Sequence, residues 1–288
     1  MCLCPLTGRW SGILILLFCG MQAAWSHDAE PIRVMSFNLR YGTANDGEDS
    51  WPLRRELVVR TIRQFQPELL GMQEVQPLQV EYLQQQFPEY HYLGWSRDAS
   101  SSGEQCGILI LKDRFELLNS GQFWLSETPD QKYSKSWDSS LPRVCTWGQV
   151  RDRNGTRQQL LFANTHFDHR GVQARAESGN LLMRRLVSLA DKSPIILTGD
   201  FNCDEGSDAW NSLVKQGGMR DTYLQVSRSV ENASGTFHGF RGTPGTARID
   251  WILCSPVFRT ESAAIDHTHD GNRYPSDHFP VTAVLLTD

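Results

Sequence analysis

The chain alternates between short apolar runs and longer amphipathic stretches. Short runs rich in Val, Ile, Leu and Phe predict strands at residues 32–38, 69–75, 105–111, 115–125, 143–151, 159–165, 194–198, 248–254, 258–265 and 279–286. Stretches with apolar residues three and four positions apart predict helices at residues 52–65, 77–87, 174–190 and 208–215. Many strands with a few interleaved helices indicate an α/β fold of two packed sheets with helices outside.

The first residues follow a different pattern, which is typical of a secretory signal peptide. Arg9 is the only charged residue in this segment, and the apolar run 13–18 follows it. Ala24 and Ser26 then place small residues where a signal peptidase requires them. An uncleaved membrane anchor is the weaker alternative, because a spanning helix needs about 20 apolar residues. We therefore expect residues 1–26 to be removed by cleavage near Ser26.

After cleavage, the chain is expected to be exported to the periplasm or the extracellular space as a single catalytic domain, residues 27–288. No internal repeat, low-complexity linker or proline-rich hinge divides this part of the chain. A Gly-rich loop at residues 234–245 precedes the last three predicted strands. One domain is the simpler interpretation at this length.

Composition limits the range of partners. The formal net charge is −5, and the N-terminal segment, with one Arg and no acidic residue, makes no negative contribution to it. An acidic chain lacks the broad basic surface of a protein that binds duplex nucleic acid through phosphates. The argument against a nuclease is mild, because a local basic patch or a bound cation can supply positive charge.

Four of the seven Cys lie outside the N-terminal segment, namely Cys106, Cys145, Cys203 and Cys254. They are widely spaced and show no C-x-x-C zinc pattern. Three of them lie in apolar stretches, so we expect buried free thiols. Export also permits a disulfide, and the sequence leaves its pairing open.

Polar residues that bind metals or transfer protons recur at the C-terminal ends of apolar strands or directly beside them. They are Asn38, Glu74, His166, Asp168, Asp200, Asn202, Asp250, Asp277 and His278. Each alone has a plain structural explanation, such as a turn. Together they indicate a site, because carboxylates beside strongly apolar runs must be paired or bind a cation.

Three of these residues suit a divalent cation. Asn38, Glu74 and Asp277 offer hard oxygen atoms, which favour Mg²⁺ or Mn²⁺ over zinc. Such an ion would polarise a phosphoryl oxygen and neutralise charge on the leaving oxygen. The residues therefore predict a metal-assisted reaction at a phosphate ester.

The other residues suit proton transfer and phosphate binding. Asp200 could accept a proton from the attacking water, while Asn202 holds water or phosphate in line. His278, oriented by Asp250, could bind a non-bridging oxygen or act as the acid–base group. His166 could donate a hydrogen bond to the developing pentacovalent centre.

Six short motifs carry a resemblance to a known family. In chain order they are Ser36-Phe37-Asn38, Gln73-Glu74-Val75, Asn164-Thr165-His166, Gly199-Asp200-Phe201-Asn202, Arg248-Ile249-Asp250-Trp251 and Ser276-Asp277-His278-Phe279-Pro280. In this order they resemble the endonuclease/exonuclease/phosphatase superfamily, which includes pancreatic deoxyribonuclease, abasic-site endonucleases, deadenylases, inositol polyphosphate 5-phosphatases and bacterial sphingomyelinases. The resemblance extends over residues 32–286. It implies a four-layer α/β sandwich like that of pancreatic deoxyribonuclease, with the site where strand ends of both sheets meet.

The resemblance implies the same division of roles among the residues. The metal-binding set is Asn38, Glu74 and Asp277, and the catalytic set is His166, Asp200, Asn202, Asp250 and His278. Accounts of the family differ on whether Asp200 or His278 is the base, so this assignment stays open.

The sequence around these six motifs resembles that of an exported bacterial branch of the superfamily. We expect the substrate side to be lined by Trp137, Arg143, Asp168, Arg170 and His238. Arg can clamp phosphate, and aromatic rings can stack on a ring of the substrate. Plain alternatives remain, such as an ion pair of Arg143 with Asp138 or simple packing of Trp137.

The expected function is hydrolysis of phosphoester bonds by in-line attack of water, with Mg²⁺ or Mn²⁺ as cofactor. We expect a monomeric phosphodiesterase or phosphatase that acts on a modest-sized phosphoester. A secreted endonuclease or exonuclease is the first alternative, so nucleic acid remains a possible but less favoured partner. A sphingomyelinase-like phospholipase would need an exposed apolar hairpin, and none stands out. A non-catalytic binding module is disfavoured, because the full set of chemical residues is present.

Overall fold

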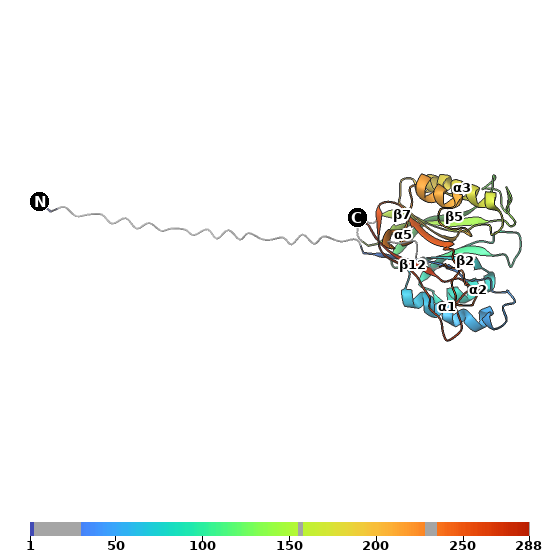
Figure 1. Ribbon diagram of the computed structural model, residues 1–288. Helices are drawn as coiled ribbons and strands as arrows, with labels where there is room; N and C mark the ends of the chain where they lie inside the picture. The colour runs from blue at the N-terminus through green and yellow to red at the C-terminus, as the bar shows by residue number, and fades with distance from the viewer. Residues whose placement is uncertain (3–29, 155–157, 228–234, 288) are drawn as a thin grey trace.

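The computed structural model describes residues 1–2, 30–154, 158–227 and 235–287. Two mixed six-stranded sheets pack face to face, and helices cover both outer faces (Figure 1). The predicted four-layer α/β sandwich is therefore confirmed. Apart from its first two residues, the expected signal peptide lies outside the described residues.

The first sheet contains the N-terminal and C-terminal strands of the domain. In spatial order its strands are β11 (Phe258–Ile265), β12 (Val281–Thr287), β1 (Ile32–Asn38), β2 (Leu69–Val75), β4 (Gln105–Leu111) and β3 (Tyr90–Leu93). Strands β1 and β2 run parallel, and the other neighbouring pairs of this sheet are antiparallel. The C-terminal ends of β1 and β2 consequently lie at the same edge.

The second sheet is built from the middle of the chain. In spatial order its strands are β5 (Phe115–Trp124), β6 (Val144–Asp152), β7 (Gln159–His166), β8 (Ile195–Asp200), β10 (Asp250–Cys254) and β9 (Arg220–Asp221). Here β7 and β8 are the parallel pair. Their C-terminal ends also meet at one edge, as those of β1 and β2 do in the first sheet.

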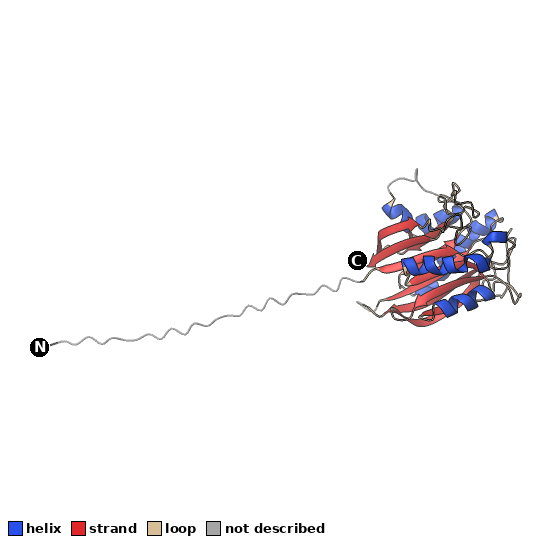
Figure 2. Cartoon of the chain, turned by 90° about the horizontal axis from the view of Figure 1, so that it is seen from below, coloured by secondary structure: helices blue, strands red, loops and turns tan. Residues whose placement is uncertain are grey.

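The helices cover the outer faces of the two sheets (Figure 2). The first sheet carries α1 (Trp51–Phe65) and α2 (Pro77–Gln86), and the second carries α3 (Val172–Ala190). The shorter helical segments are η1 (Gly47–Asp49), α4 (Asp208–Trp210), the π-helix η2 (Asn211–Gln216) and α5 (Thr222–Val226). Proline in the first turn fits the start of both α1 and α2.

Alternation along the strands explains the layers. In β1, Ile32 and Val34 belong to the buried cluster between the sheets, while Met35 and Phe37 belong to the cluster beneath α1. Successive side chains of a strand point to opposite faces, so a strand buried on both faces reads as a nearly continuous apolar run. The apolar runs of the sequence are therefore strands of two-sided sheets.

The same alternation directs the polar strand ends into the space between the sheets. In β8, Asp200 lies two residues beyond Thr198 and four beyond Ile196, which belongs to the cluster between the sheets. In β1, Asn38 continues the row of Val34 in the same way. Polar residues thus replace apolar ones on the inner faces where the strands end, and a site forms between the sheets.

Below this site the two sheets approach closely. Asn164 of β7 accepts a hydrogen bond from Gln73 of β2 at 2.6 Å and donates to the carbonyl of Met72 at 2.8 Å. At Gly71, a Cβ atom would lie 2.0 Å from the hydroxyl of Thr198. Glycine is required there because any side chain would force the sheets apart.

Most predicted elements are present, with shifts of a few residues at their ends. The strands β3 and β9 and the helix α5 were not predicted, and the predicted helix 208–215 is a short α-helix that continues as a π-helix. The strand predicted from residue 279 begins at Val281, after a stretch of loop. The prediction of buried free thiols is confirmed for Cys106, Cys145 and Cys254, whereas Cys203 is unpaired but only half-buried.

Candidate active site

Strand ends of both sheets bring the predicted catalytic residues together. Asn38 and Glu74 come from the ends of β1 and β2, and Asp200 comes from the end of β8. Asp250 begins β10 directly opposite Asp200 in the antiparallel ladder. His278 lies in the loop before β12 and reaches this group from the first sheet.

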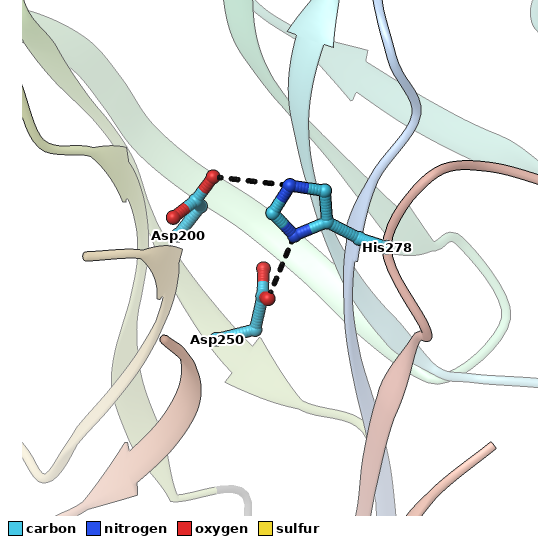
Figure 3. Close-up of side chains that lie close together, drawn as sticks. All are labelled: Asp200, Asp250 and His278. Atoms are coloured by element: carbon cyan, nitrogen blue, oxygen red, sulfur yellow. Dashed lines mark hydrogen bonds and ion pairs between the residues drawn. The ribbon is translucent and has the colours of Figure 1, made fainter. Parts of the chain in front are cut away.

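His278 lies between two carboxylates (Figure 3). Its Nδ1 is 2.9 Å from Asp250 Oδ2, and its Nε2 is 3.8 Å from Asp200 Oδ2. All three side chains are buried. This arrangement fixes the orientation of the imidazole ring and favours its protonated form.

Burial and charge shift the pKa values of this group. Burial alone would lower the pKa of His278, but the charges of Asp250 and Asp200 outweigh it and raise that pKa well above its usual range. Burial, together with repulsion from Asp250, raises the pKa of Asp200 to about 7. The pair therefore combines a carboxylate that can take up a proton near neutral pH with an imidazolium that holds one.

Asn202 and His166 form a second polar pair beside Asp200. The Asn202 amide nitrogen lies 3.0 Å from His166 Nε2 and donates to the carbonyl of Phe167 at 3.1 Å. Burial and the nearby charge of Arg143 lower the pKa of His166 well below its usual range, so this ring is neutral. Two neutral polar groups therefore lie beside Asp200.

Asn38 connects the two sides of the site. Its amide nitrogen donates to Asp200 Oδ2 at 2.9 Å and to Glu74 Oε1 at 3.2 Å. Glu74 lies in an irregular part of β2 and has a left-handed backbone, with φ of 61°. Left-handed backbone is costly for a residue with a side chain, and such strain concentrates at functional positions.

Asp277 completes an oxygen-rich group with Asn38 and Glu74. Its carboxylate is largely buried, and burial together with the charge of Glu74 raises its pKa. The Arg40 guanidinium lies 3.9 Å from it. Neighbouring carboxylates that repel one another fit a divalent cation, and their hard oxygen atoms suit Mg²⁺ or Mn²⁺.

Asp200, Asp250 and His278 also lie close enough together to hold an ion. Asn38, Glu74 and Asp277 are better candidates for holding a cation than this triplet. A protonated His278 between two carboxylates already supplies the positive charge that a metal would provide there.

Two of the predicted substrate-side residues lie next to this site. Arg143 is buried and lies beside His166, with its Nε 3.4 Å from Asp168 Oδ2. Both carboxylate oxygens of Asp168 already accept hydrogen bonds, from Ser140 and Arg143 among others. Asp168 thus fixes Arg143 and its own loop, and it does not point a free oxygen toward the substrate.

The other three predicted substrate-side residues have different surroundings. Arg170 is exposed, and the partly buried Trp137 packs against the core beneath α3. The His238 ring is buried and stacks on Phe279 at 3.9 Å between ring centroids. The contact of His238 with the site is through its backbone amide, which donates to the carbonyl of Asp277.

Sequence reasoning missed residues that border the site. Arg97 and Glu104 lie in the loop between β3 and β4 and line a cavity beside Glu74 and His166. Phe237 is exposed, and its ring lies 5.1 Å from the His278 ring. The only sequence signal for Phe237 was its position directly before His238 in the Gly-rich loop. For Arg97 the sequence offered no signal beyond the charge of its side chain.

Comparison with known proteins gives relatives that are similar in sequence and in fold. The endonuclease/exonuclease/phosphatase family model matches residues 35–278. A family protein from Bacteroides thetaiotaomicron is 33% identical, with a TM-score of 0.84 over 91% of this chain and 97% of that one. The mannosyl-6-phosphatase of the same organism is also 33% identical, with a TM-score of 0.81 over 88% of this chain and 99% of that one.

A eukaryotic relative is more distant. Nocturnin from Xenopus laevis is 26% identical over 88% of this chain and 71% of its own length. The family match covers most of the chain, and it includes the strand ends from Asn38 to His278 that build the site. The chain belongs to the endonuclease/exonuclease/phosphatase family.

Proposed function

We propose that this protein is a metal-dependent phosphatase that hydrolyses a phosphate monoester of modest size. The observation that carries the proposal is the placement of His278 between Asp200 and Asp250, beside the oxygen-rich group of Asn38 and Glu74. This arrangement combines a proton acceptor, a fixed imidazolium and a cation site within one buried strand-end cluster.

The residues of the chain have distinct parts in this reaction. Asp200 takes a proton from the water that attacks phosphorus, because its raised pKa suits a base near neutral pH. His278, oriented by Asp250, donates a hydrogen bond to a phosphoryl oxygen, and Asn202 with His166 binds the others. A cation held by Asn38, Glu74 and Asp277 would stabilise the negative charge that develops on the phosphoryl and leaving oxygens.

Two observations favour a small monoester over a nucleic acid. The chain is acidic overall, with a net charge of −5, which disfavours binding of a nucleic-acid duplex through its phosphates. One of the solved structures similar to this chain is that of a mannosyl-6-phosphatase. A phosphorylated sugar is therefore the first substrate class to test.

The test is hydrolysis by purified protein with Mg²⁺, with Mn²⁺ or with EDTA. The substrates are mannose 6-phosphate, p-nitrophenyl phosphate, bis-p-nitrophenyl phosphate and plasmid DNA. Metal-dependent release of phosphate from the monoesters supports the proposal. Preferential cleavage of DNA would instead establish the nuclease alternative. Hydrolysis that persists in EDTA would show that the reaction needs no cation.

We also propose that the protein is exported, as in the bacterial branch expected from the sequence. The proposal rests on the charge and small-residue pattern of residues 1–26. Among the described residues, no helix has the length and apolar character needed to cross a bilayer. Intact mass of the protein recovered from outside the cytoplasm tests cleavage near Ser26, and a mass that retains residues 1–26 would contradict it.

A further inference from the structure

A small cavity adjoins the catalytic residues on the side of Glu74 and His166. Its volume is about 10 Å³, and Arg97, Glu104 and Arg143 contribute to its wall. That volume admits about one water-sized group. The cavity is therefore too small for a sugar ring or a base, but it fits a single oxygen atom of a bound substrate.

Arg97 is held rigidly at this cavity. The residue is 9% exposed, and its Nη2 donates to Glu104 Oε1 at 2.8 Å. Its carbonyl accepts a hydrogen bond from the Trp124 indole at 2.8 Å, and its amide donates to the carbonyl of Glu104. Its buried Nε makes no hydrogen bond within the described parts of the chain, and the nearest carboxylate oxygen, of Asp98, is 3.9 Å away.

Arg143, directly before β6, lines the same cavity. The residue is 4% exposed, its Nε lies 3.4 Å from Asp168, and its Nη2 lies 3.0 Å from His169 Nδ1. Its buried Nη1 has no hydrogen-bond partner among the residues that the structure describes. Asp168 is itself fixed by Ser140, so Arg143 cannot turn away easily.

These two cations are close enough to affect each other. Burial, and then the charge of Arg97, lowers the pKa of Arg143. Burying unpaired guanidinium N–H groups is unfavourable, and an oxyanion is the ligand that their geometry and charge match best. Glu104 is already paired with Arg97, and Asp168 is already paired with Arg143.

We propose that Arg97 and Arg143 form an oxyanion subsite that binds a terminal oxygen of a phosphate monoester and excludes the second ester arm of a diester. The inference rests on the proposed phosphatase function and deepens it by naming the ester class. A monoester presents three terminal oxygens, so one can enter the cavity while others face His278 and His166. In a diester bound the same way, the carbon of the second arm would meet the cavity wall.

The experiment compares a monoester with its matched diester. Steady-state kinetics on p-nitrophenyl phosphate and bis-p-nitrophenyl phosphate are measured for the native protein, Arg97→Gln and Arg143→Gln. We expect each variant to lose about 10- to 100-fold in kcat/KM on the monoester, the effect of one or two lost charged hydrogen bonds. The diester rate should change little or rise.

Binding of inorganic phosphate gives a readout that does not need turnover. Phosphate should raise the Tm of the native protein, and the rise should be much smaller in Arg97→Gln. The matched control is Arg185→Gln, which removes a half-buried arginine paired with Asp130 and should behave as the native protein does. If the Gln variants do not fold, Arg97→Lys is the replacement. It keeps the charge but loses the planar guanidinium group with its paired N–H donors, and it should still weaken phosphate binding.

The outcomes separate this inference from the proposed function. A native protein that hydrolyses neither these two esters nor mannose 6-phosphate with Mg²⁺ or Mn²⁺ present refutes the proposed function, whereas Arg97-dependent phosphate binding would still support the subsite. Equal losses on both esters, or phosphate binding unchanged in the variants, would overturn the subsite alone. A native preference for the diester would overturn it as well.

Discussion

Asp200 is the residue on which the chemistry depends most directly. It lies within hydrogen-bonding or ion-pair distance of Asn38, His166 and His278. Asp200→Asn keeps the shape of the side chain but cannot accept the proton of water, so kcat should fall by about 10³-fold. The measurement is kcat on the best monoester, together with Tm to show that the protein is folded.

Asp204→Asn is the matched control for this substitution. Asp204 is an exposed acid four residues along the same connection, and its side chain makes no hydrogen bond or ion pair among the described residues. This variant should keep native activity. If Asp200→Asn retained near-native kcat, Asp200 would not be the base.

The Asp250–His278 pair predicts a particular pH dependence. Activity requires Asp200 without its proton and His278 with its proton, so kcat/KM should rise and then fall as pH increases. Asp250 raises the pKa of both groups, by repelling the Asp200 carboxylate and by attracting the His278 imidazolium. Asp250→Asn should therefore move both limbs of the profile to lower pH and reduce its maximum.

The alkaline limb is the decisive part of this profile. A bound cation would lower the pKa of Asp200, so the acidic limb depends on metal concentration and is measured at saturating Mg²⁺. An alkaline limb that stays in place in Asp250→Asn would show that another group controls it.

Among the structural elements, the connection after β8 places Asn202 in a left-handed conformation with φ of 50°. Asn202→Gly tolerates this backbone but removes the amide that contacts His166 and Phe167. Asn202→Ala removes the amide and also leaves a residue with a Cβ atom in the unfavourable left-handed conformation. It should therefore be about 1–2 kcal/mol less stable than Asn202→Gly. Both should lose activity.

Urea unfolding and kcat together separate the two effects. Equal stability of the Gly and Ala variants would mean that the backbone relaxes out of the left-handed conformation. Native activity in Asn202→Gly would show that the turn matters and the amide does not.

Most strands could be predicted from the sequence because their burial is two-sided. In β8, Ile196 faces the other sheet and Leu197 faces α3, so the strand reads as an unbroken apolar run. The period of two then places Asp200 on the inner face. The core of the site was accessible to this reasoning, because its residues directly follow or begin such strands.

The elements that escaped prediction have little local signal. Strand β3 is an edge strand of half-buried residues, and β9 has only two residues. Arg97 follows Trp95 and Ser96 in a Ser- and Gly-rich connection that reads as solvated loop. Its burial comes from Glu104 and Trp124, contacts that only the tertiary structure brings together.

The whole molecule is organised so that the site spans both sheets. Asn38, Glu74 and Asp277 belong to the first sheet and its loops, and Asn38 donates to Asp200 of the second. Without a cation, the carboxylates of the half-buried Glu74 and the buried Asp277 repel each other. Binding of a cation to the native state alone must stabilise the fold.

Mg²⁺ or Mn²⁺ should therefore raise the Tm of the protein, and EDTA should reverse the rise. At a cation concentration 100 times Kd, the expected stabilisation is about 2.7 kcal/mol. Glu74→Gln should remove most of the response to the cation. Calcium-free buffers and the Asp204→Asn variant serve as controls for nonspecific effects of divalent ions. A Tm that is insensitive to Mg²⁺ and Mn²⁺ in the native protein would refute a cation site between Glu74 and Asp277, whatever the activity proves to be.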